Sequence, residues 1–110
     1  VFTQNRVAAA PVVIAKANLK ASKGKATAIL VNAGNANCGT GAQGLSAARK
    51  SCEAVARAIG CAPEAVMPFS TGVIGQRLPV ERMCRDAPET PLDVPLHPAA
   101  EKFWRERGYL

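Results

Sequence analysis

The chain has 110 residues and a formal net charge of +6 at pH 7, with 48% hydrophobic and 20% charged residues. This ordinary globular mixture excludes a disordered or fibrous chain, and the apolar runs are far shorter than the roughly 18 residues needed to cross a bilayer. The composition therefore predicts one small soluble domain without a transmembrane helix. A domain of this size buries about two-thirds of the surface that its unfolded chain exposes.

The positive charge is concentrated in the first half of the chain. Residues 1–60 carry eight lysines and arginines against the single acid Glu53, whereas residues 80–110 carry five basic and six acidic groups. A basic surface can meet the phosphates of a nucleic acid or of coenzyme A, or it can simply be solvated. Because the charges are spread and no aromatic residue lies between them to stack bases, a nucleic-acid partner is disfavoured.

The cysteines and the amino end indicate the compartment. No secretory signal is visible and Val1 is not a methionine, which predicts a processed start or a fragment. The cysteines form no C-x-x-C pair and have His97 as the only histidine to help them, so no metal site, zinc included, is predicted. They are predicted to be reduced thiols, with Cys52 a small core residue; the set is Cys38, Cys52, Cys61 and Cys84.

In chain order, residues 1–3 look like the end of a strand, and residues 8–20 predict a helix with Pro11 in its first turn. Residues 26–31 are apolar and partly β-branched, which predicts a buried strand. From Leu45 to Ile59 apolar positions recur at helical spacing, and Gly60 is expected to end this amphipathic helix.

The second half of the chain begins with regular elements and then changes. Pro63 can open a short turn, residues 66–70 predict a strand, residues 71–75 a tight turn and residues 80–85 a short helix. Beyond Asp86 four closely spaced prolines predict an extended linker, followed by a short helix over residues 99–110. The expected division is a domain at 1–86 and a proline-rich linker with a carboxyl-terminal helix at 87–110.

The stretch N-A-G-N-A-N-C-G-T-G, residues 32–41, follows the expected buried strand and precedes a helix. Such a loop offers backbone N–H groups and a helix N-terminus to an anion or polar ligand. It is not a phosphate-binding loop, because no G-K-[ST] closes it. A ligand loop and a run of Asn and Gly turns are equally compatible with these residues.

A second stretch, F-S-T-G-V-I-G at residues 69–75, places a threonine beside a glycine at the end of a strand. The Thr71 hydroxyl and the Gly72 N–H can jointly donate to an oxygen that becomes negative during acyl transfer. The plain alternative is a Ser/Thr turn. Ser70 is disfavoured as a nucleophile because the G-x-S-x-G motif is absent and the only histidine lies among prolines.

Three blocks then carry a resemblance in order and spacing: V-F-T-Q-N-R-V-A-A-A-P-V (residues 1–12), A-I-L-V-N-A-G-N-A-N-C-G-T-G-A-Q-G (28–44) and S-T-G-V-I-G-Q-R-L-P (70–79). From Val1 to Met83 the chain resembles the ornithine acetyltransferase family. The resemblance implies an α/β fold, the α/β sandwich of that family, incomplete in this chain. It also implies a cytoplasmic enzyme that transfers acetyl from N-acetylornithine to glutamate and, in some members, from acetyl-CoA.

In that family the Thr-Gly of the S-T-G-V-I-G stretch forms the oxyanion hole. The matching residues in this sequence are Thr71 and Gly72, which the chemistry of their groups had already singled out. The resemblance implies no metal and no cofactor apart from acetyl-CoA as a substrate, and it implies an oligomer in the full enzyme. The family's nucleophile is a threonine further downstream, at the bond where the precursor cuts itself into two chains. No counterpart follows Met83, and both ends look shortened. This chain is therefore expected to be inactive without the remaining family segments.

The tail supports a different class of function. Residues 93–110, D-V-P-L-H-P-A-A-E-K-F-W-R-E-R-G-Y-L, resemble the carboxyl end of solute-binding receptors of tripartite transporters, so the family resemblance is expected to stop near Asp86. The alternative to an acetyltransferase fragment is a non-enzymatic binding module. It would be either a basic nucleic-acid binder, given the basic first half of the chain, or a piece of such a receptor, given the tail.

Overall fold

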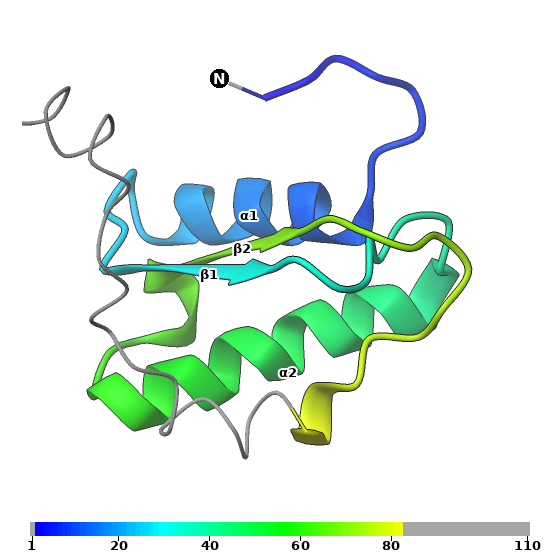
Figure 1. Cartoon of the computed structure of the whole chain (residues 1–110). Helices are drawn as coiled ribbons and strands as arrows, with labels where there is room; N and C mark the ends of the chain where they lie inside the picture. Colours follow the sequence, from blue (N-terminus) through cyan, green and yellow to red (C-terminus); the bar gives the residue numbers. More distant parts are fainter. Residues whose placement is uncertain (1, 83–110) are drawn as a thin grey trace, which may run out of the picture.

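The computed structural model describes residues 2–82, which form a small α/β unit (Figure 1). Two helices, α1 (Ala10–Ala21) and α2 (Gly41–Ile59), alternate with two strands, β1 (Ala28–Asn32) and β2 (Val66–Ser70). A 3-10 turn at Pro63–Ala65 leads into β2. The expected α/β class is therefore confirmed. No helix among residues 2–82 is long and apolar enough to cross a membrane.

Both helices form where the sequence predicts them. Pro11 lies in the first turn of α1, where its missing N–H costs no helical hydrogen bond. The second helix begins four residues earlier than Leu45, at Gly41, and ends as expected at Gly60. This glycine adopts the left-handed conformation with φ of 71°, and its N–H donates to the Ala56 carbonyl. Residues 80–82 are helical, and the remainder of the predicted helix 80–85 lies outside the described residues.

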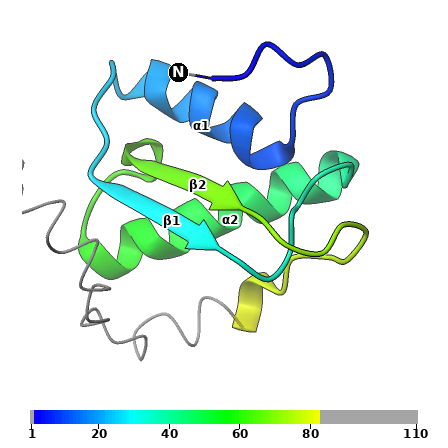
Figure 2. The ribbon, with the colours of Figure 1, turned by 45° about the horizontal axis from the view of Figure 1, so that its top comes forward.

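The two strands are parallel, with a register that runs from Ala28 opposite Val66 to Asn32 opposite Ser70. A parallel pair needs a crossover connection, and α2 provides it. The carboxyl ends of both strands consequently lie at the same edge of the sheet, where the chain leaves Asn32 and Ser70 side by side (Figure 2). This topology brings together two loops that are far apart in the sequence.

The face of the sheet that carries Ile29 and Val31 is largely open, although Met67, which is paired with Ile29, is buried (Figure 2). The strand predicted at residues 26–31 is confirmed as β1, but its predicted burial is wrong: β1 alternates, with Ile29 68% and Val31 64% exposed. An apolar run does not reveal whether a second layer is present. The strand end predicted at residues 1–3 is also wrong for Phe2 and Thr3, which are irregular because no strand of the described part pairs with them.

The core lies between the helices and the covered face of the sheet, and Cys52 is part of it, as predicted. Burial raises the pKa of the Cys52 thiol to about 11, which keeps it protonated and unreactive at neutral pH. The Asn18 side-chain amide donates to the carbonyl oxygens of Val66 (2.8 Å) and Pro63 (3.2 Å), which fixes the start of β2 against α1. The buried cluster consists of Ile14, Ala48, Cys52, Ala56 and Val66.

Ile14→Ala tests this core. The side chain is 2% exposed, so its removal leaves a cavity and should lower the free energy of unfolding by about 2–5 kcal/mol. Urea denaturation of the 110-residue chain measures the change. Val13→Ala is the matched control, since this neighbour on α1 is 40% exposed and should change stability by less than about 0.5 kcal/mol. Similar losses for both variants would contradict the packing of α1 described above.

The predicted linker and the helix at residues 99–110 lie outside the described residues. The division into 1–86 and 87–110 therefore remains a prediction.

Candidate functional site

The site is built where the chain leaves the two parallel strands. The Thr71 N–H donates to the Asn32 carbonyl (2.8 Å), and the Val73 N–H donates to the Gly34 carbonyl (3.0 Å). In return the Ala36 N–H donates to the Val73 carbonyl (3.0 Å), so the ladder of the sheet continues past the strand ends. The two stretches singled out in the sequence, residues 32–41 and 69–75, are thus in direct contact.

Gly72 sits at the closest approach of these two segments. Its φ of 122° is rarely adopted by other residues, and a Cβ at this position would lie 2.6 Å from the Gly34 carbonyl carbon and in contact with its oxygen. Both the backbone conformation and the lack of space therefore require glycine. The Gly72 backbone is consequently held against the 33–35 turn with little freedom to shift.

Thr71 and Gly72 offer two adjacent donors that the rest of the described chain does not use. Within residues 2–82, neither the Thr71 hydroxyl nor the Gly72 N–H makes a hydrogen bond, although the N–H groups of Thr71 and Val73 are both paired. Both residues are exposed, so water can reach the donors and a ligand oxygen can replace it. A fixed N–H next to a hydroxyl suits an oxygen that gains negative charge during a reaction.

The side chains of the 32–41 loop mainly hold the loop itself. Asn37 is 2% exposed; its amide N–H donates to the Gly44 carbonyl (3.1 Å), and its oxygen accepts from the Thr40 hydroxyl (2.8 Å). These contacts tie the loop to the start of α2. The Asn35 amide donates to the Gln76 side-chain oxygen (3.3 Å), which is a further link between the two loops. The asparagines here therefore support the turn interpretation of this stretch.

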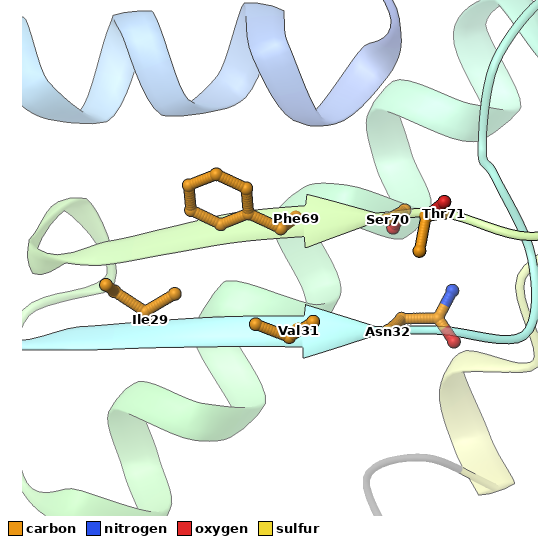
Figure 3. A pocket seen from close by; sticks show the side chains of 6 residues that line it. All are labelled: Ile29, Val31, Asn32, Phe69, Ser70 and Thr71. Atoms are coloured by element: carbon orange, nitrogen blue, oxygen red, sulfur yellow. The ribbon is translucent and has the colours of Figure 1, made fainter. Parts of the chain in front are cut away.

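The open sheet face carries a hollow of about 340 Å³ beside Thr71 (Figure 3). Its floor is apolar and comes from both strands, whereas its polar end is formed at the strand ends. Sequence reasoning missed this surface because it assigned β1 to the interior. The lining residues are Ile29, Val31, Asn32, Phe69, Ser70 and Thr71.

No nucleophile with a base beside it is found in the described part of the chain. Ser70 is half-buried at the end of β2, and its hydroxyl makes no hydrogen bond within residues 2–82. His97, the only histidine, lies outside those residues. No group of three or more His, Cys, Asp or Glu residues that could hold a metal is present between residues 2 and 82.

Fold and site together define an α/β protein in which two donors without a partner among residues 2–82 lie where the parallel strands end. The family model described as "ArgJ family" matches residues 1–102. The chain belongs to the ArgJ family, which confirms the resemblance found in the sequence and argues against the binding-module alternative.

Two curated relatives are both named arginine biosynthesis bifunctional protein ArgJ. The one from Neisseria gonorrhoeae is 49% identical over 106 residues, covering 96% of this chain and 24% of the relative. The one from Methylococcus capsulatus is 53% identical over 83 residues, covering 76% of this chain and 20% of the relative. This chain thus spans about a quarter of the length of the curated relatives that it matches.

Two solved structures share the fold at 36% sequence identity and a TM-score of 0.71. One is ArgJ from Bacillus halodurans, where the match covers 76% of this chain and 44% of that chain. The other is ornithine acetyltransferase from Mycobacterium tuberculosis in complex with ornithine, with 76% and 45% covered. The chain is therefore similar to part of each of these folds.

The expectation that the family resemblance stops near Asp86 is wrong, because the family match continues to residue 102. The Neisseria relative likewise aligns over 106 residues. The prolines and the change of charge after Asp86 mark a change of local character, and such a change can occur inside one family.

Proposed function

We propose that this chain is part of a cytoplasmic acetyltransferase of arginine biosynthesis that moves acetyl from N-acetylornithine, or from acetyl-CoA, to glutamate. In it the Thr71 hydroxyl and the Gly72 N–H form the oxyanion hole. The supporting observation is that these two donors have no partner among residues 2–82 and lie on a turn that hydrogen bonds on both sides hold in place. Donors fixed before the reaction stabilise a developing charge without reorganisation.

The chemistry assigned to the two residues is the following. A nucleophilic oxygen, contributed by a threonine outside this chain, attacks the acetyl carbonyl carbon and forms a C–O bond. The carbonyl π electrons move to the oxygen, which becomes an oxyanion and accepts hydrogen bonds from Thr71 and Gly72. Collapse of this intermediate breaks the C–N bond and expels the ornithine amine, which takes up the proton that the threonine hydroxyl gave up. The amine of glutamate then attacks the acyl-enzyme and forms a new C–N bond through a second oxyanion at the same two donors. Collapse of this second intermediate breaks the C–O bond, and a proton from the glutamate amine returns to the threonine oxygen.

The open sheet face supports the view that the chain acts together with the remaining family segments. Phe69, Ile29 and Val31 are each more than half exposed on one continuous face, next to the proposed oxyanion hole. Apolar side chains gathered in this way are typical of a surface that another layer covers. We assign that layer to the other three-quarters of the family protein, which also carries the nucleophile and forms the oligomer.

Activity of the isolated chain is the direct test. The purified 110-residue chain should show no acetyl transfer from N-acetylornithine to glutamate above a matched blank, because no nucleophile lies beside a base among residues 2–82 and no counterpart of the family's threonine follows Met83. A chimera, in which residues 1–102 replace the matching segment of the Neisseria gonorrhoeae relative, should transfer acetyl at a rate close to that of the parent. Turnover by the isolated chain, or a folded chimera without activity, would contradict the proposal.

A further inference from the structure

We infer that Asn32 is a positioning residue, whose side chain sets the place of the Gly72 N–H; this role rests on the proposed function of the Thr71–Gly72 turn. Asn32 ends β1, and its side chain lies beside Thr71 at the polar end of the hollow (Figure 3). The Asn32 side chain is not proposed to contact the substrate. It acts through the backbone of residues 33–35, which lies against Gly72.

The Asn32 side chain closes the turn that follows β1. Its amide N–H donates to the Asn35 carbonyl (2.6 Å), and its oxygen accepts from the Gly34 N–H (3.2 Å). Asparagine favours such turns because its amide can imitate a backbone peptide, with a donor and an acceptor on the same short side chain. The side chain therefore fixes Gly34 from one side and Asn35 from the other.

The turn held by Asn32 is also the support of the proposed oxyanion hole. The Gly34 carbonyl accepts from the Val73 N–H (3.0 Å) and occupies the space next to Gly72 where a side chain would otherwise be. The Asn32 backbone carbonyl meanwhile accepts from the Thr71 N–H (2.8 Å). Any movement of Gly34 is consequently transmitted to Gly72 by direct contact. A misplacement of about 1 Å at such a site can cost on the order of a hundredfold in rate.

The test uses the chimera that carries residues 1–102 and compares Asn32→Ala with two further variants. Asn32→Ala removes both side-chain hydrogen bonds and should lower kcat about tenfold or more, with KM within about twofold, because the oxyanion forms only in the transition state. Asn32→Ser keeps a short oxygen that can accept from the Gly34 N–H, and it should recover part of the loss. Unchanged kcat in folded Asn32→Ala would overturn the inference.

Asn37→Ala is the matched control from the same loop. The Asn37 amide binds the start of α2 and contacts no part of the 69–75 turn by hydrogen bonds. Its loss should lower the melting temperature, whereas kcat per folded molecule should stay within about twofold of the parent. If Asn37→Ala and Asn32→Ala lower kcat equally, Asn32 has only a general structural role and the inference is wrong.

A double variant separates this inference from the proposed function. If Asn32 acts through the oxyanion hole, Asn32→Ala should cost less in a Thr71→Val background than alone, since residues that act as a unit are not additive. Full additivity would contradict the positioning role. If Thr71→Val alone retains full kcat, the proposed oxyanion hole itself fails. If Thr71→Val is impaired while Asn32→Ala is not, only the inference about Asn32 fails.

Discussion

Thr71→Val is expected to lower kcat of the chimera by about a hundredfold and to change KM little. Valine keeps the branched shape of threonine but has no hydroxyl, so the oxyanion loses one of its two donors. The donor acts on charge that exists only in the transition state, and the loss therefore falls on the rate constant rather than on substrate binding. Steady-state kinetics, with a melting curve on the same preparation, measure both effects.

Ser70→Ala is the control for Thr71→Val. Its hydroxyl is the neighbouring one at the end of β2, and no role is assigned to it, so its removal should cost much less than a hundredfold. If the 71–75 segment is only a structural turn, Thr71→Val should lower stability and leave the activity of each folded molecule intact. If folded Thr71→Val retains full kcat, the assignment of Thr71 to the oxyanion hole is wrong.

Gly72→Ala should lower kcat at least as much as Thr71→Val does. Unlike Thr71→Val, it should also lower the stability of the fold. The added Cβ meets the Gly34 carbonyl, and the φ of 122° is strained for alanine. Strain of the backbone alone costs on the order of 1–3 kcal/mol, and relief of the contact moves the Gly72 N–H away from Gly34. We expect kcat of the chimera to fall by more than about a hundredfold, together with a lower melting temperature.

Gly75→Ala separates strain from contact in that experiment. Gly75 also has a positive φ, 89°, but nothing lies within 4 Å of the position of an added Cβ. This variant should therefore carry the cost of backbone strain and retain most of kcat. If Gly72→Ala and Gly75→Ala lower kcat equally, the close contact between Gly72 and the Gly34 carbonyl does not matter for the reaction.

The helices were predictable because their signals are local. Pro11 and Gly60 mark one helix start and one helix end through constraints that act within a single turn. Strands β1 and β2 were also located correctly, but the exposure of Ile29 was not predicted, because burial of a strand depends on which layers cover it. The same apolar run fits an interior strand and a strand with one open face.

The candidate site was predictable in part. Thr71 and Gly72 follow from the chemistry of their groups and from the family resemblance. The role of Asn32 did not follow, although an asparagine two residues before a glycine is a recognisable turn signal. What the sequence does not show is that this turn lies against Gly72, which is far along the chain. That contact arises from the parallel pairing of β1 with β2.

The pairing of the strands also has a consequence for solubility. Within residues 2–82 the sheet has only two strands, so each strand leaves one row of backbone N–H and C=O groups without a partner strand. The outer edge of β2 lies along α1, where Asn18 donates to the Val66 carbonyl, whereas the outer edge of β1 stands beside the exposed side chains of Ile29 and Val31. Unpaired edges beside apolar surface are templates for aggregation. We therefore expect the outer edge of β1 to pair with other copies of the segment when the remaining family segments are absent.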